Sequence, residues 1–245
     1  MAVPRHLASA PITEAILDIR VKLPADFDVE KLKSAQSLIS GGYPKVTERR
    51  RFEGQVQFSV GGPPKQVALD KGPDGYLFTS TDSKQIVQFR LDGFTFNRLK
   101  PYETWESMRD EGYRLWQHYV DIASPELITR VALRYINHLK IPLPTGNFAD
   151  YLVAPPTVPG QLPHIVTSFL TRVVIIDSSI GAAANISQAL DSISDGNIIL
   201  DIDVYKQAEF SVEGKGAWGM LEKLRRFKNR IFFESVTEQT LRLCE

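Results

Sequence analysis

Hydrophobic and charged residues alternate near the start of the chain. From residue 17 to residue 23 the odd positions are apolar and the even positions are charged. A period of two is typical of a strand with one face on a core and the other in water. The apolar spacing becomes helical after Asp28, a favourable N-cap residue, and Gly41-Gly42 provides a helix end. The segment therefore predicts a strand followed by a helix.

The next part of the chain continues the alternation in several short segments. Gly54 is expected to turn the chain, and the run Gly61–Pro64 is expected to interrupt the pattern. Asp92-Gly93 is typical of a two-residue hairpin turn, which would pair Leu91 with Phe94. The predicted strands are 45–52, 56–60, 65–70, 75–81, 84–91 and 94–99.

A helix and a long strand are predicted in the middle of the chain. Apolar residues recur at helical spacing over 104–123, and alternation returns over 127–141. On this strand Tyr135 shares one face with apolar residues. The other face carries basic side chains, namely Arg130, Arg134 and His138.

A proline-rich segment separates these elements from the C-terminal ones. Six prolines fall in residues 142–163, and proline both removes backbone donors and stiffens an extended path. We therefore divide the chain into an N-terminal α+β half (1–141), this connection, and a C-terminal half (164–245), which can also form one continuous domain. The C-terminal half is predicted to hold strands 164–177, 182–191 and 197–206 and a helix over 215–230.

The order of the elements predicts an α+β fold. Runs of strands interrupted by isolated helices favour a predominantly antiparallel, curved sheet packed on a few long helices. One pattern is also repeated, since Leu17–Val21 and Leu200–Val204 share alternating apolar and charged positions. This similarity indicates two related halves as a further hypothesis.

The composition excludes only a few kinds of partner and structural feature. The 245 residues include 29 basic and 29 acidic side chains, so no global field attracts nucleic acid or an anionic membrane. Cys244 is the single cysteine, which excludes an intramolecular disulfide. The first residues lack the apolar core of a signal peptide, and no apolar run approaches the ~20 residues of a membrane span. We expect a cytoplasmic protein without a membrane partner.

The sequence contains no recognisable catalytic signature. There is no Gly-x-Ser-x-Gly elbow, no phosphate-binding loop, and no histidine pair at i, i+4 spacing. Asp201 and Asp203 share a strand face and could hold Mg²⁺, although a solvated face is the more common explanation. We expect a non-enzymatic protein without metal or cofactor, with an Asp-x-Asp or His138 centre as the enzymatic alternative.

Basic side chains are the candidate binding residues. Arginines on one strand face can bind a carboxylate or phosphate, and Tyr135 becomes the candidate if a pocket lies on the apolar side. A basic amphipathic helix is typical of a surface for an acidic partner or nucleic acid, although zero net charge favours an ordinary solvated face. The candidates for a ligand are Arg130, Arg134, Tyr135 and His138, and those for a partner surface are Lys223, Arg225, Arg226, Lys228 and Arg230.

Three stretches carry a resemblance to a known family. Pro11–Ala15, Leu133–Asn137 and Phe232–Thr237 resemble a sporadically distributed, uncharacterised family of bacterial proteins of similar length. The resemblance spans most of the chain and implies no activity, cofactor or catalytic residue. A patchy distribution would suit accessory systems such as defence, immunity or toxin–antitoxin systems.

Two functional hypotheses follow from the sequence. The first is a non-enzymatic binding protein that acts through a protein partner, in which a strand is added to a sheet edge or a helix is docked. A homodimer through strand edges or the C-terminal helix is the default assembly. The alternative is a small-ligand or anion-binding domain, with a pocket between the sheet and the helices. Nucleic acid is a less favoured partner.

Overall fold

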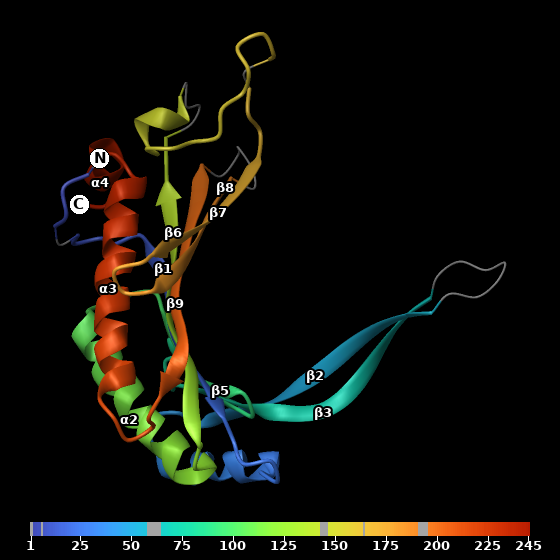
Figure 1. Cartoon of the computed structure of the whole chain (residues 1–245). Coiled ribbons are helices and arrows are strands. Elements are labelled where there is room, and N and C mark those ends of the chain that lie inside the picture. Colours follow the sequence, from blue (N-terminus) through green and yellow to red (C-terminus); the bar gives the residue numbers. More distant parts are fainter. Residues whose placement is uncertain (1, 6, 58–64, 143–146, 164, 191–195) are drawn as a thin grey trace.

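The α+β class and the antiparallel sheet are confirmed by a computed structural model (Figure 1), which describes residues 2–5, 7–57, 65–142, 147–163, 165–190 and 196–245. Nine strands form one open sheet in the order β2-β3-β4-β5-β1-β6-β9-β8-β7, and every neighbouring pair is antiparallel. The strands are β1 (Ile12–Lys22), β2 (Lys45–Gln57), β3 (Lys65–Thr79), β4 (Gln85–Arg90), β5 (Gly93–Leu99), β6 (Leu127–Lys140), β7 (Phe169–Asp177), β8 (Ala182–Leu190) and β9 (Asn197–Phe210).

Helices α2 and α3 lie on one side of this sheet, whereas the β2–β3 hairpin projects from the other side as an arm (Figure 1). The expected packing on a few long helices is not confirmed, because the four α-helices of the described residues have 5 to 20 residues. None of them is long and apolar enough to cross a membrane. The helices are η1 (Val29–Ser34), α1 (Ala35–Ile39), α2 (Trp105–Ala123), η2 (Phe148–Asp150), α3 (Gly216–Ser235) and α4 (Glu238–Arg242).

The core lies between the sheet and the helices, and both α2 and α3 contribute buried residues to it. Thr104 caps α2 by accepting a hydrogen bond from the backbone N–H of Ser107, and the helix buries an aromatic stripe. The Trp116 ring packs edge-to-face on Phe94 at a centroid distance of 5.7 Å, and Tyr119 packs on Phe89 at 5.3 Å. Such pairs add about 0.5–1.5 kcal/mol to the burial of their surface. They fix α2 against β4 and β5.

The predicted β4–β5 hairpin is present, but its register differs from the expected one. Phe89 pairs with Phe94 and Arg90 with Gly93, so Leu91-Asp92 forms the turn. Gly93 has a φ of +146°, and a Cβ there would lie 2.1 Å from the carbonyl oxygen of Ile19. The glycine is therefore required within the strand, where β1 approaches closely, rather than in the turn.

The predicted turn at Gly54 is wrong. β2 runs through this residue, which pairs with Ala68 of β3. The two strand segments predicted over 65–81 are likewise one strand, β3, whose pairing with β2 contains two register shifts near Arg50. A two-stranded arm lets polar and charged residues continue a ladder without an apolar core. The expected break at Gly61–Pro64 lies outside the described residues.

Strands from both sides of the proline-rich segment share one sheet. β6 precedes that segment and pairs with β9, which follows it, from Ile128 opposite Phe210 to Lys140 opposite Asn197. β1 and β9, which carry the repeated pattern, flank β6 on either side. The division at residues 142–163 and the relation between two halves stay predictions.

Gly93→Ala tests the close approach of β5 to β1. We expect the free energy of unfolding to fall by at least about 2 kcal/mol, because the added methyl group meets backbone atoms and the φ is unfavourable. Gly219→Ala is the matched control, since that exposed glycine of α3 has open space and alanine favours helix by about 1 kcal/mol. Urea denaturation measures both, and equal stabilities of the two variants would contradict the assignment.

Candidate functional site

The basic face of β6 is part of a network of paired charges. The carboxylate of Asp18 accepts hydrogen bonds from Arg90 (2.8 Å), Arg130 (2.9 Å) and Thr95 (2.8 Å). Burial alone would raise the pKa of Asp18, but the charges of Arg90, Arg20 and Arg130 and the Thr95 hydrogen bond outweigh it, so this pKa is lowered. Asp18 is therefore ionised, and it holds Arg130 in place.

Arg134 is also occupied by an acid of the chain. Its guanidinium binds Asp201 in a bidentate manner, with distances of 2.9 and 2.6 Å. Arg130 reaches Asp203 at 3.5 Å and stacks over the ring of Tyr205, and burial raises the pKa of Asp203. Both arginines predicted to bind an anion thus already hold carboxylates. Among the described residues, no cluster of His, Cys, Asp and Glu could hold a metal ion.

His138 lies further along the same face of β6. It lines a separate cavity of about 280 Å³ together with Lys100, Lys140 and Cys244. Arg130 and Arg134 do not line this cavity. The structure therefore does not gather the three basic residues of β6 into one site.

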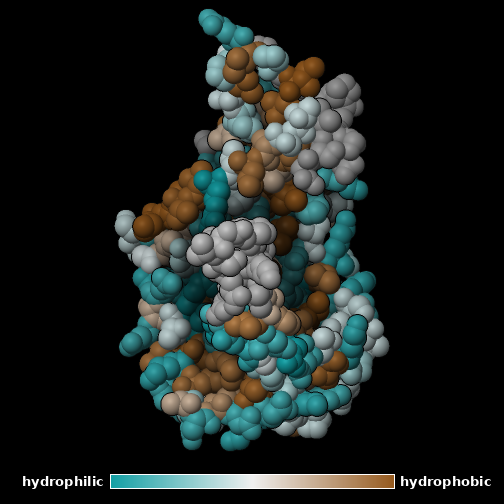
Figure 2. Space-filling model, turned by 90° about the vertical axis from the view of Figure 1, so that its right-hand side faces the viewer, coloured by the Kyte–Doolittle hydropathy of each residue, from teal (hydrophilic) through white to brown (hydrophobic). Residues whose placement is uncertain are grey.

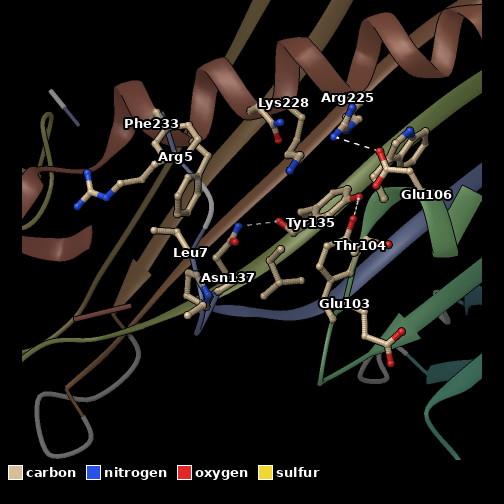
Figure 3. A pocket seen from close by; sticks show the side chains of 18 residues that line it. Arg5, Leu7, Glu103, Thr104, Glu106, Tyr135, Asn137, Arg225, Lys228 and Phe233 are labelled. Atoms are coloured by element: carbon tan, nitrogen blue, oxygen red, sulfur yellow. Dashed lines mark hydrogen bonds and ion pairs between the residues drawn. The ribbon is translucent and has the colours of Figure 1, made fainter. Parts of the chain in front are cut away.

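The apolar face of β6 contributes to a different cavity, of about 400 Å³, between β6 and α3 (Figure 3). Residues 102–106 and six residues near the N-terminus form the rest of its wall, namely Arg5, Leu7, Ala8, Ala10, Pro11 and Ile12. Tyr135 enters from β6, whereas Arg225 and Lys228 enter from α3 (Figure 3). The cavity is thus lined by one of the ligand candidates, Tyr135, and by two of the partner-surface candidates, Arg225 and Lys228, which were predicted to belong to separate sites.

Lys228 is the unusual residue of this cavity. It is only 8% exposed, and its Nζ lies 3.7 Å from the centre of the Tyr135 ring. Within the described part of the chain, no carboxylate lies within ion-pair distance of this nitrogen, and no hydrogen bond reaches it. Burial, and to a lesser degree the charge of Arg225, lowers the pKa of Lys228 to about 7. The cavity therefore contains an amine that titrates near neutrality.

Two phenols lie beside the lysine. The hydroxyls of Tyr102 and Tyr135 are 3.0 Å apart and hydrogen-bonded, and Tyr135 also contacts the sulfur of Met108 at 3.8 Å. Burial raises the pKa of both tyrosines, so each keeps its proton and can donate it to a hydrogen bond. Asn137 is held by a bond from its Nδ2 to the carbonyl oxygen of Leu200 (2.9 Å).

The other charged residues around the cavity are paired. Arg225 lies 3.6 Å from Glu106 and 3.9 Å from Glu222, and Glu103 binds Arg98 at 2.7 Å. Arg5 binds two acids near the C-terminus, Glu238 at 2.9 Å and Glu245 at 2.7 Å. Lys228 is thus the single charged lining residue without an opposite charge, as far as the described residues show.

The basic residues of α3 do not form one continuous surface. Lys223, Arg226 and Arg230 are exposed, whereas Lys228 is buried. Arg230 is paired with Asp177 of β7 at 2.6 Å. The sequence pattern gives the helical face of each residue, but it does not show which of them face a cavity.

A second surface was missed by the sequence reasoning. β7 is the last strand of the sheet, and its apolar side chains are exposed on both faces, with Leu170 and Ile176 about three-quarters exposed. The signal was present as four successive β-branched residues, Val173–Ile176, which is typical of a strand covered on both faces. Hydrophobic surface is also visible at the top and along the left-hand edge in Figure 2.

Comparison with protein-family models and with curated proteins finds no match for this chain. The resemblance to the bacterial family therefore stays a prediction. The three stretches that carry it nevertheless meet at the cavity, each with two lining residues. These are Pro11 and Ile12, Tyr135 and Asn137, and Phe232 and Phe233.

Lys228→Met tests the buried charge. Below pH 7 the lysine is charged in both the folded and the unfolded protein, so the fold bears the full cost of burial. Between pH 7 and its usual pKa of 10.5 the unfolded chain binds more protons, and the free energy of unfolding of the native protein rises with pH. We expect the substitution to stabilise the protein by about 2 to 3 kcal/mol more at pH 6 than at pH 9.

Urea denaturation at both pH values provides this measurement. Lys223→Met is the matched control, because Lys223 lies on the same helix but is exposed, and its effect should be the same at both pH values. An equal effect of Lys228→Met at pH 6 and pH 9 would contradict the burial of an unpaired amine.

Proposed function

We propose that the protein is a small-ligand-binding protein whose site is the cavity between β6 and α3. The observation that supports this proposal is Lys228, a buried amine that lies at the wall of a cavity and has no acidic partner among the residues the structure describes. A buried charge costs stability unless it is paired, and a group with a perturbed pKa in a cleft marks a functional site in many proteins. A cavity of about 400 Å³ is within the range of ligand pockets.

The lining combines apolar and polar groups, as ligand pockets do. Leu7, Trp105 and Phe233 offer hydrocarbon and aromatic surface. Among the polar groups, Tyr135, Arg225 and Lys228 lie close together (Figure 3), and the phenol of Tyr102 is hydrogen-bonded to that of Tyr135. The proposal requires no catalytic step, and it develops the second of the two hypotheses drawn from the sequence.

A thermal-shift screen with anions, nucleotides and fatty acids tests the site. A ligand of the cavity should raise the melting temperature, since it binds only the folded protein. Ala8→Trp, which places an indole in the cavity wall, should remove the shift. Arg134→Ala is the control on the opposite face of β6 and should leave the shift unchanged. A flat screen, or a shift that survives Ala8→Trp, would contradict the proposal.

The first hypothesis, a protein partner, is favoured by a separate observation, the exposed apolar side chains of β7. We propose as the second function that another chain adds a strand to this edge. An edge strand presents unpaired backbone groups, and apolar side chains on both of its faces supply the burial that strand addition needs. In a symmetric antiparallel pair of two copies centred on Val173, Leu170 lies opposite Ile176. A homodimer, a cytoplasmic location and a role in a bacterial accessory system belong to this second proposal.

A photo-crosslinking residue in place of Val173 tests strand addition. Val173 is 55% exposed, and Leu38 of α1, 54% exposed, is the matched control position away from the edge. The variant is expressed in the organism from which the protein comes, and the crosslinked chain is identified by mass spectrometry. We expect crosslinks from position 173 to map to an extended segment of another chain. Light scattering then shows whether that chain is a second copy. Equal crosslinking from both positions would contradict the proposal.

A further inference from the structure

We infer that the ligand of the cavity is a small organic monoanion, a carboxylate on an apolar body, and that its carboxylate pairs with Lys228. This inference rests on the proposed ligand site and specifies its chemistry. Its basis is the missing opposite charge beside Lys228, the hydrogen-bond donors that surround the lysine, and the apolar surface of the wall.

Lys228 is the one positive charge of the wall that has no carboxylate beside it among the described residues. The acids of the wall, Glu103 and Glu106, each have an arginine partner, and Arg5 is held by two acids. Lys228 has no such partner among the described residues. A monoanion gives Lys228 the opposite charge that it lacks, whereas a dianion such as a phosphate monoester would bring a second negative charge into a wall that already contains Glu103 and Glu106.

The donors around the lysine suit a carboxylate. The Tyr102 and Tyr135 hydroxyls are hydrogen-bonded to each other, and Tyr135 also donates to the Met108 sulfur at 3.8 Å, a weak acceptor that a carboxylate oxygen can replace. Arg225 enters from the same side as Lys228, three residues earlier on α3 (Figure 3). Its ion pairs with Glu106 and Glu222 are long, at 3.6 and 3.9 Å. A carboxylate accepts several hydrogen bonds at once. Hydrogen bonds to a charged group are also stronger than those between neutral groups.

The rest of the wall suits a hydrocarbon body. Its apolar members come from the N-terminal segment, from the start of α2 and from α3, so they surround the polar end. A chain of several carbons or an aromatic ring gains about 25 cal/mol for each Å² of apolar surface it buries. These members are Leu7, Ile12, Trp105, Phe232 and Phe233.

Binding should be linked to protonation of the lysine. Arg225, Glu103, Glu106, Arg5 and the two phenols are the charged or titratable groups that line the cavity with it. The free lysine loses its proton near pH 7, whereas the carboxylate stabilises the charged form. Above pH 7 the complex must therefore take up a proton, and affinity should fall roughly tenfold for each pH unit.

Titration calorimetry with matched acids and amides tests the inference. The probes are octanoate against octanamide and phenylacetate against phenylacetamide, pairs that differ chiefly in the charge of the head group. At pH 6 at least one acid should bind ten times or more tightly than its amide. At pH 8.5 this preference should shrink, and measurements in two buffers of different ionisation enthalpy should show uptake of close to one proton. The wild-type protein suffices for these measurements.

Variants then assign the effect to the lysine. Lys228→Met should bind acid and amide equally, while Lys228→Arg should keep the preference without its dependence on pH between 6 and 8.5. Lys223→Met is the control and should behave as the wild type. Equal binding of acid and amide by the wild type, or a preference that survives Lys228→Met, overturns the inference and leaves the ligand site standing. If neither pair binds and the broader screen is flat, the site itself is wrong.

Discussion

The pairing of β6 along both of its edges is the constraint on which the rest of the structure depends. This strand lies between β1 and β9, and antiparallel pairing on both sides fixes its register. Leu133 and Tyr135 face the helices, whereas Arg134 faces the charged side of the sheet. A slip of one residue would exchange these faces, so the register that forms the core also places the phenol of Tyr135 in the cavity. The register of β6 therefore both stabilises the fold and forms the candidate site.

The buried Lys228 destabilises the folded protein, and packing alone does not explain why a lysine stands at this position. A buried amine must either carry an unpaired charge or give up its proton, and each destabilises the folded state at some pH. A methionine would fill the same space between α3 and Tyr135 without that cost. Contact of the charge with the Tyr135 ring offsets part of this cost, since such contacts contribute about 2 kcal/mol in a desolvated site. If the lysine pairs with a negatively charged ligand, binding of that ligand explains its presence.

Much of the fold could be predicted from local patterns, and the site could not. Alternation located β6 and β9, and helical spacing located α2, because each pattern reflects burial of one face. The turn at Gly54 and the register at Asp92-Gly93 were mispredicted because glycine serves two purposes, to turn a chain and to admit a neighbouring backbone. The exposed apolar side chains of β7 depend on which strand lies at the sheet edge, and that is a property of the whole topology.

Local sequence patterns also do not show which basic side chain is available to bind an anion. Arg134 and Lys228 were both candidates because each is basic and lies on a regular element, yet they differ in what the rest of the chain brings to them. Arg134 meets Asp201, 67 positions away, in a bidentate pair, and a ligand would have to displace that carboxylate to bind. Lys228 meets an aromatic ring, and a ligand would displace no carboxylate of the described part of the chain. Pairing between distant residues therefore decides which cation is available, and this favours the cavity over the basic sheet face as the place where an anion binds.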